Sequence, residues 1–326
     1  MNKEMKLQDE NDRALHVPVM LSEILELLGP ALNRPDSVLV DCTLGMAGHS
    51  SALLKANPQA KLVGIDRDPQ ALEVASRNLA EFSDRTTFVQ ARFDELVNLD
   101  LPRVDVVLFD LGLSSLQIDR TGRGFSYSHD SALDMRMGGN ELTAAQIVNT
   151  YSQQELVKIF RAYGEEPNAK RIATAIVKER EKEPFEMSGR LVEVIADSLP
   201  AAVRHRGGHP AKRVFQALRI EVNGELDAFS AALPAALEKV NLGGRIAVLS
   251  YHSLEDRIAK KTFAKACSDD VPKDLPIVPL DRAAKFKLLT KGAQKPTRYE
   301  VEENSRSASA RLRAVERIRQ DEKGEI

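Results

Sequence analysis

The sequence has few of the features that mark membrane, secreted or strongly charged proteins. It contains no run of about 18 apolar residues, the length that a membrane-spanning helix needs. Its two cysteines, Cys42 and Cys267, form no C-x-x-C pair, which excludes a disulfide framework and a cysteine-based zinc site. Residues 1–16 have no apolar core and resemble neither a signal peptide nor a transit peptide. We therefore expect a cytoplasmic globular protein that does not act at a membrane.

An overall excess of charge is also missing, because the formal net charge is −2. The basic residues are nevertheless unevenly distributed. Residues 203–219 hold five Arg or Lys and no acid, and residues 282–319 hold eleven Arg or Lys against four Glu. Either stretch alone could be solvated surface charge. Together they favour a local surface that binds a polyanion such as RNA.

Short apolar runs alternate with helical patterns over the first third of the chain. The runs are VLVD (38–41), KLVGID (61–66), TTFVQ (86–90) and VDVVLFD (104–110). Continuous runs rich in Val, Ile and Leu are typical of parallel strands buried on both faces, which indicates an α/β fold. Asp41, Asp66 and Asp110 end three of these strands. We expect these carboxylates at the carboxyl edge of the sheet, where ligands bind in open α/β sheets.

A helical region interrupts this pattern. Ser152 and Glu155 form a capping-box signature, and Ser188 is expected to cap a further helix. Apolar residues with the spacing of one helix face follow the capping box, at Ala169, Ile172, Ala173, Ile176 and Val177. A long amphipathic stretch over 215–240 then leads to strands over 245–250 and 311–318, with a loop over 272–296.

These patterns define a discontinuous organisation. We predict a disordered tail over 1–13, one α/β domain formed by 14–117 and 220–326, and a helical insertion over 118–219.

The first strand is followed by a loop with two glycines, Gly45 and Gly48. Glycine allows a sharp turn and a close approach of the backbone to a ligand. Asp66 follows Gly45 by 21 residues, where a carboxylate can accept both hydroxyls of a ribose. The loop lacks the second glycine of the dinucleotide pattern G-x-G-x-x-G, and Asp41 would repel a pyrophosphate but could bind an ammonium. These features favour S-adenosylmethionine over NAD.

Asp110 begins the segment DLGLSS at the end of the fourth predicted strand. An exocyclic amine is a poor nucleophile because its lone pair is delocalised into the ring. A carboxylate that accepts a hydrogen bond from the amine helps to localise this pair for in-line attack on a methyl group. Asp110 is therefore the candidate catalytic residue, although a carboxylate that merely ends a strand is an equally ordinary role.

Several motifs together resemble the bacterial RsmH (MraW) family of 16S rRNA cytosine-N4 methyltransferases. They include HVPVMLSEIL, DCTLGMAGHS, GIDRDPQAL, FDLGLSSLQID, RGFSY, LDMRM, YGEEPNAKRIA, FQALRIEVNGEL and SYHSLEDRIAKK, and they extend from about His16 to Arg317. The resemblance implies a Rossmann-like class I methyltransferase fold, with the helical insertion over 118–219 as the domain that contacts the RNA substrate. It also implies S-adenosylmethionine as the cofactor and, as the substrate, the N4 amine of a cytidine in the decoding (P-site) region of 16S rRNA or of the small ribosomal subunit.

The family's cofactor positions correspond to one set of residues in this sequence, namely Ala47, Gly48, His49, Asp66, Phe93, Asp110 and Gln117. Phe93 is expected near the adenine, and the backbone of His49 is expected to matter more than its ring. Many family members have two glycines before the histidine, whereas Ala47 precedes Gly48 here. An alanine is tolerable unless that position requires a positive φ.

Other residues are weaker candidates for the site. A flipped base would need an aromatic partner, for which Phe125, Tyr127 and Tyr251 are candidates. Two further pairs are site candidates or structural ion pairs, Asp134 with Arg136 and His252 with Glu255. A metal site at His205 and His209 is rejected, because the glycines and proline around them break any helix there.

Two rival functions remain open at this point. An NAD-dependent oxidoreductase would use the same fold, and a non-catalytic RNA-binding assembly factor would keep the cofactor site without the reaction. The oligomeric state also stays open, a homodimer included.

Overall fold

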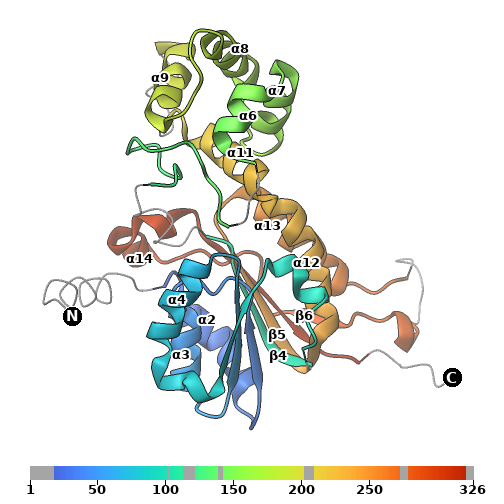
Figure 1. Ribbon diagram of the computed structural model, residues 1–326. Coiled ribbons are helices and arrows are strands. Elements are labelled where there is room, and N and C mark those ends of the chain that lie inside the picture. The colour runs from blue at the N-terminus through green and yellow to red at the C-terminus, as the bar shows by residue number, and fades with distance from the viewer. Residues whose placement is uncertain are drawn as a thin grey trace, which may run out of the picture. The chain divides into compact units, whose positions relative to one another are not determined.

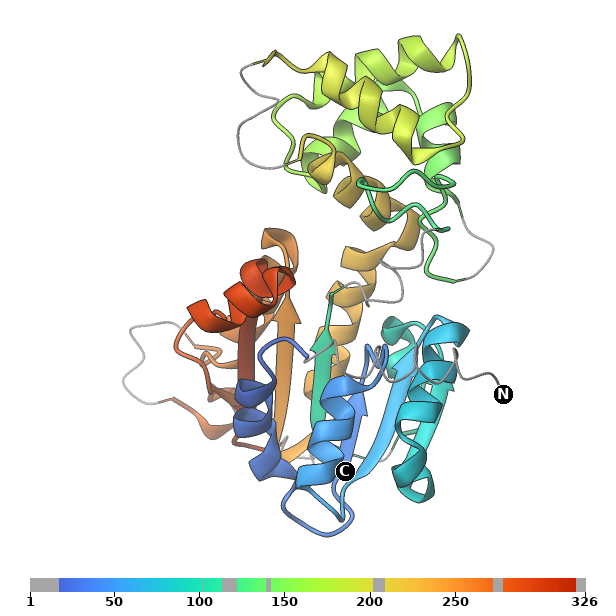
Figure 2. The ribbon, with the colours of Figure 1, turned by 90° about the vertical axis from the view of Figure 1, so that its left-hand side faces the viewer.

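The computed structural model describes residues 18–101, 103–112, 122–138, 142–201, 209–271 and 278–320 (Figures 1 and 2). Contacts between Cα atoms divide the chain into two compact units. We name them the sheet unit (Met1–Asp66, Gln70–Gly112 and Ser230–Ile326) and the helical unit (Arg67–Pro69 and Leu113–Phe229). The tail expected over 1–13 lies outside the described residues.

The boundary at Phe229 differs from the one at 219 drawn from the sequence. It falls inside helix α12 (Glu225–Lys239), which is continuous across it. Because the boundary lies within one continuous helix, no change in the sequence pattern marks it. The assignment of the inserted segment as a substrate domain stays a proposal.

A seven-stranded sheet with the order β3-β2-β1-β4-β5-β7-β6 forms the sheet unit. Its strands are β1 (Val38–Asp41), β2 (Lys61–Asp66), β3 (Thr86–Gln90), β4 (Val104–Asp110), β5 (Val240–Ser250), β6 (Phe286–Leu288) and β7 (Arg311–Arg317). The first five are parallel, as the buried apolar runs predict, and β7 is antiparallel to both β5 and β6. Within the described residues no helix has the length and apolar character to cross a membrane.

Helices cover both faces of this sheet (Figure 1). One face carries α2 (Leu21–Leu28), α3 (Gly48–Ala56) and α4 (Pro69–Asn78), and the other carries α12 and α13 (Ser253–Ala266). The chain turns to opposite sides after β1 and β4, which are neighbours, so the crevice for a ligand lies beyond their carboxyl ends.

Short helical segments complete the sheet unit. They are the 3₁₀ turns η1 (Gly29–Leu32), η2 (Ala80–Arg85), η3 (Phe93–Val97), η4 (Leu280–Arg282) and η5 (Ser305–Ser309), and the helix α14 (Arg298–Glu303).

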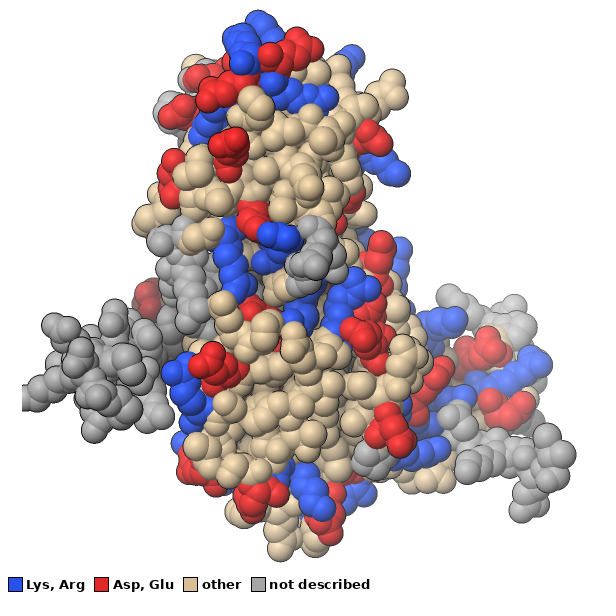
Figure 3. Space-filling view, viewed as in Figure 1, with Lys and Arg blue, Asp and Glu red and all other residues tan. Residues whose placement is uncertain are grey.

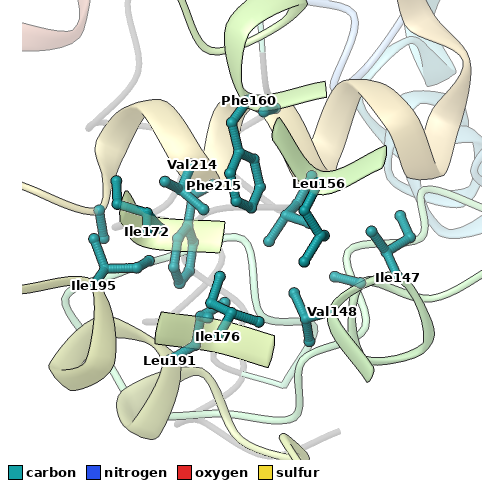
Figure 4. Packing of buried hydrophobic residues seen from close by; sticks show 14 of the residues in the cluster. Ile147, Val148, Leu156, Phe160, Ile172, Ile176, Leu191, Ile195, Val214 and Phe215 are labelled. Atoms are coloured by element: carbon teal, nitrogen blue, oxygen red, sulfur yellow. The ribbon is translucent and has the colours of Figure 1, made fainter. Parts of the chain in front are cut away.

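Among its described residues, the helical unit packs five helices around its own apolar core. They are α6 (Ala144–Thr150), α7 (Gln153–Ala162), α8 (Ala169–Arg180), α9 (Ser188–Ser198) and α11 (Lys212–Asn223). Figure 4 shows side chains from these helices meeting in that core, among them Phe160, Ile176 and Phe215. The capping box of Ser152 and Glu155 is confirmed at the start of α7.

Three expectations about element boundaries were wrong. Ser188 is the first residue of α9 and does not cap it, because Met187 occupies the extended N-cap position. The stretch over 215–240 is not one helix, because Gly224 takes a left-handed conformation with φ 59° and separates α11 from α12. The segment 272–296, expected to be a loop, contains the short edge strand β6.

Arg317 joins the last strand to helix α12. Its side chain is 1% exposed, and it donates hydrogen bonds to the carbonyl oxygens of Leu237, Glu238 and Val240 at 3.0–3.3 Å. The carbonyls at the end of a helix have no partner within the helix. One buried guanidinium therefore satisfies the end of α12 and holds it against β7.

We predict that Arg317→Ala lowers the free energy of unfolding by about 3 kcal/mol, because it leaves several buried carbonyls without a charged donor. Urea denaturation followed by circular dichroism measures this change. Arg282→Ala, at an exposed position, is the control and should change stability by less than about 0.5 kcal/mol. Equal stabilities of the two variants would contradict this role for Arg317.

Candidate functional site

The loop between β1 and α3 adopts a conformation that alanine disfavours. Ala47 has φ 64° and ψ 27°, in the left-handed region, and precedes the first residue of α3, Gly48. A left-handed conformation costs a residue with a Cβ atom about 1–2 kcal/mol. The position therefore does require a positive φ, which explains why glycine suits it, and the buried packing of Ala47 offsets the strain.

The loop is held from several sides. The backbone N–H of Gly45 donates to Oδ2 of Asp66 at 2.9 Å, which ties the loop to the end of β2. The side-chain amide of Asn78 donates to the carbonyl of Met46 at 3.0 Å. Leu44 packs against Gly64, where a Cβ atom would lie 2.6 Å from the leucine side chain. Asp66 therefore anchors the loop as well as standing at the predicted ribose position.

The position of Asp41 contradicts its predicted role as a partner for an ammonium group. Its side chain is 2% exposed, and it accepts hydrogen bonds from Ser50 Oγ at 2.6 Å and from the Thr43 N–H at 3.1 Å. Burial raises the pKa of Asp41 to about 6. Asp41 connects the loop to helix α3, and it is too enclosed to meet a ligand.

The ring of His49 takes part in the site, contrary to the expectation that its backbone matters more. Nε2 lies 2.9 Å from the carbonyl of Val19, and Nδ1 lies 3.4 Å from Oδ2 of Asp110. A carbonyl and a carboxylate only accept, so this geometry favours a ring with protons on both nitrogens, the imidazolium form. Burial alone would lower the pKa of His49, but the hydrogen bond and charge of Asp110 outweigh it and raise the pKa.

Asp110 is the centre of a hydrogen-bonded group at the end of β4. Its Oδ1 accepts a hydrogen bond from the Tyr251 hydroxyl at 3.0 Å, and its backbone N–H donates to Thr43 Oγ1 at 2.6 Å. The ring of Tyr251 lies over Gly112, where a Cβ atom would be 2.7 Å from it. The Asp110 side chain remains 25% exposed, so Tyr251 and His49 orient a carboxylate that solvent can still reach.

Register places the two accessible carboxylates in one row. Asp41 of β1 pairs with Gly64 on one side and Leu108 on the other, so Asp66 and Asp110 each lie two residues beyond it. They flank the glycine loop from both neighbouring strands. The sequence predicts these carboxylates at one edge of the sheet. The register adds that Asp66 and Asp110 lie at the same position along their strands, on either side of β1.

Phe93 opens the turn η3 after β3 and is half-buried. Its ring meets the ring of Phe109 edge-on, with a centroid distance of 6.1 Å. Phe109 of β4 fixes the orientation of Phe93 near the same edge of the sheet. Gln117 lies outside the described residues, so its predicted role stays a prediction.

Several weaker candidates have structural contacts in the helical unit. Asp134 and Arg136 pair with each other through two hydrogen bonds of 2.7–2.8 Å, and the Arg136 bond lowers the pKa of Asp134. Phe125 belongs to the helical core, and Tyr127 stacks on His209 with a centroid distance of 4.5 Å. Of the three candidate aromatics, Tyr251 is the one that contacts Asp110.

His252 and Glu255 shape the start of α13. Glu255 is buried and accepts hydrogen bonds from the backbone N–H groups of Tyr251 and His252 at 2.8 and 3.2 Å. His252 Nε2 lies 3.0 Å from Oε1 of Glu255. This pair fixes the turn that presents Tyr251 to Asp110.

Sequence reasoning missed Thr43 and the link from Tyr251 to Asp110. Thr43 had a local signal, since it stands two residues after Asp41 in the glycine loop. Tyr251 was recognised only as a candidate aromatic.

Comparison with known proteins decides the family. The profile of the MraW methylase family matches residues 13–318. The chain belongs to the MraW methylase family. This membership confirms the resemblance drawn from the sequence motifs and, with the observed sheet, confirms the Rossmann-like methyltransferase fold.

Curated relatives of this MraW-family chain share more than half of its residues. A protein of Streptomyces avermitilis named ribosomal RNA small subunit methyltransferase H is 56% identical over 311 residues, covering 94% of this chain and 98% of the relative. Proteins of the same name from Saccharopolyspora erythraea and Nocardioides sp. are 55% and 53% identical, covering 94% and 93% of this chain and 95% and 96% of theirs.

The residues at the sheet edge fit S-adenosylmethionine, the methyl donor of this family. Asp66 offers an acceptor for ribose hydroxyls, Phe93 offers a half-buried ring, and Asp110 offers a negative charge for a cation. Carboxylates on both sides of the glycine loop would repel a pyrophosphate. Electrostatic repulsion therefore still disfavours NAD. Asp110, and not the buried Asp41, is the carboxylate available to a positively charged ligand group.

We predict that Asp66→Ala weakens the binding of S-adenosylmethionine by about 100-fold, since hydrogen bonds to a charged group contribute about 1.5–3 kcal/mol each. Isothermal titration calorimetry measures the dissociation constant. Asp84→Ala, at an exposed position in the same unit, is the control. Unchanged affinity in Asp66→Ala would exclude Asp66 from the ribose site.

The His49–Asp110 pair predicts a pH dependence of stability. The pKa of His49 is raised above its ordinary value of 6.5, so its stabilising contribution is full below about that pH and disappears as pH rises through the raised pKa. Relative to His49→Gln, the wild-type protein should gain more stability at about pH 6 than at about pH 9 in urea denaturation. Exposed His129→Gln should show no such difference, and a pH-independent gap between wild type and His49→Gln would rule out the charged pair.

Proposed function

We propose that this chain transfers a methyl group from S-adenosylmethionine to the exocyclic N4 amine of a cytidine in 16S rRNA, in the decoding region. One observation carries the proposal: Asp66 and Asp110 flank the glycine loop at the same level of the sheet edge. The names of the relatives support small-subunit rRNA as the substrate. The helical unit is proposed to contact the RNA.

S-adenosylmethionine would supply an electrophilic methyl group on a sulfonium. In the protein, Asp66 would hold the ribose of S-adenosylmethionine, and Phe93 would lie beside its adenine. The rest of the cofactor would lie along the glycine loop, residues 45–48. A carboxylate has about four acceptor sites. His49 and Tyr251 use part of this capacity at Asp110, which leaves acceptor capacity on the exposed side of the carboxylate.

Asp110 would act on the amine of the base. By accepting one N–H, the carboxylate would localise the nitrogen lone pair and align it for attack on the methyl group. Two neighbours, the His49 ring and the Tyr251 hydroxyl, fix the orientation of the Asp110 carboxylate. The proton lost from the amine would move to Asp110 or to solvent.

The test uses small ribosomal subunits from a strain that lacks this protein. Purified protein and labelled S-adenosylmethionine are added, and the rRNA is mapped by mass spectrometry before and after the reaction. One added methyl group on a cytidine base is the expected result. Normal S-adenosylmethionine binding without methyl transfer would instead favour a non-catalytic assembly factor, and NAD binding in its place would favour an oxidoreductase.

We predict that Asp110→Asn lowers kcat in this assay by about 100-fold or more, because a positioned acid or base contributes about 10²–10⁴-fold. Asparagine keeps the shape of the side chain but loses the negative charge that makes the carboxylate a strong acceptor for the amine N–H. The exposed Asp100→Asn variant, in the loop before β4, is the control and should keep wild-type kcat. A kcat for Asp110→Asn within threefold of wild type would remove Asp110 from the reaction.

A further inference from the structure

A second recess lies at the same edge of the sheet unit, beyond Tyr251. It is a pocket of about 190 Å³ lined by Tyr251, His252, Ser253, Lys295, Ala308, Ser309, Ala310 and Arg311. None of these residues was assigned to the cofactor. The pocket exceeds the volume of a single water in the liquid, about 30 Å³, several times over.

Tyr251 connects this pocket to the proposed reaction site. Its hydroxyl donates to Asp110 at 3.0 Å, while the residue also lines the pocket. Ser250, the last residue of β5, pairs with Arg311, the first residue of β7, so both open at the edge where Asp110 ends β4. A group in the pocket would therefore be one aromatic side chain away from Asp110.

Several basic side chains of the stretch 282–319 have structural partners. Arg313 donates two hydrogen bonds to Asp256 at 2.7 and 3.2 Å, Lys287 pairs with Glu316 at 2.8 Å, and Arg317 is buried on α12. On the face shown in Figure 3, acidic and basic side chains are mixed over both units. Basic composition alone therefore does not identify a phosphate-binding surface. The contacts of each basic residue show whether it is available to a phosphate.

Lys295 and Arg311 differ from those residues. Lys295 is exposed and forms no ion pair within the described part of the chain. Arg311 is 43% exposed, and its nearest acid, Asp256, lies 3.6 Å away and is already bonded to Arg313. Glu255, which lies beside the pocket residue His252, accepts from two backbone N–H groups. Lys295, and Arg311, which shares Asp256 with Arg313, thus line one recess together with Ser253 and Ser309.

We propose that this pocket binds a backbone phosphate of the substrate RNA, next to the nucleotide that is methylated. Lys295 and Arg311 would neutralise the phosphate, and serine hydroxyls could donate to its oxygens or to a ribose hydroxyl. The inference rests on the proposed function for its choice of RNA. Only the side chain of Tyr251 separates the pocket from Asp110. A phosphate bound in the pocket would therefore help to place the neighbouring target base at the reaction site.

The test measures binding of under-methylated small subunits by filter binding over a range of KCl concentrations. The double variant Lys295→Gln/Arg311→Gln should bind about 10-fold more weakly, and its plot of log Kd against log salt should be shallower by about 1–2. The affinity for S-adenosylmethionine should stay at the wild-type value. The double variant Lys295→Arg/Arg311→Lys keeps both charges and should restore most of the binding.

The matched control is Arg282→Gln/Lys291→Gln, which removes two exposed charges from the same stretch but outside the pocket. A wild-type salt slope in the pocket variant, or an equal loss in the control, would overturn the proposal. If replacement of Arg311 unfolds the protein, exposed Lys295→Gln alone must still reduce the slope by about 0.7–1. Binding is read without catalysis, so a failure of methyl transfer by the wild-type protein would count against the proposed function alone.

Discussion

The charged interaction between Asp110 and His49 is the constraint on which the arrangement of the site depends. Asp110 ends β4, His49 is the second residue of α3 after β1, and Tyr251 follows β5, so one carboxylate connects the segments that follow three neighbouring strands. The imidazolium also donates to Val19, which fixes the segment before α2 against the glycine loop. Because the acceptor is prepositioned by two donors, little reorganisation is needed when a substrate amine arrives.

Burial separates the three strand-end carboxylates into different roles. Asp41 is enclosed and serves the loop, Asp66 has one oxygen on Gly45 at the loop's outer side, and Asp110 is partly open to solvent. The same residue type therefore acts as a connector, an anchor with a predicted ligand role and a candidate reactive group. Strand register accounts for these different roles, since Asp66 and Asp110 lie two residues beyond Asp41 toward the carboxyl edge of the sheet.

The strands β1 to β4 could be predicted to the residue because parallel strands buried on both faces appear as continuous apolar runs. The glycine loop and Asp66 could be predicted because their signals lie within about twenty residues of one another. The partner of Asp110 could not, because Tyr251 is 141 positions away and the pairing follows from β5 lying beside β4. The burial of Asp41 and the left-handed backbone at Ala47 depend on packing that no local pattern encodes.

The place of β7 in the sheet has a consequence for how the protein forms during synthesis. β7 is inserted between β5 and β6, and its Arg317 closes the end of α12, yet among the described strands it is translated last. Until residues 311–317 leave the ribosome, the edge of β5 lacks the partner it has in the folded sheet. Such an open edge can pair with other chains, so this interval is the one in which the nascent polypeptide is most exposed to aggregation through β5.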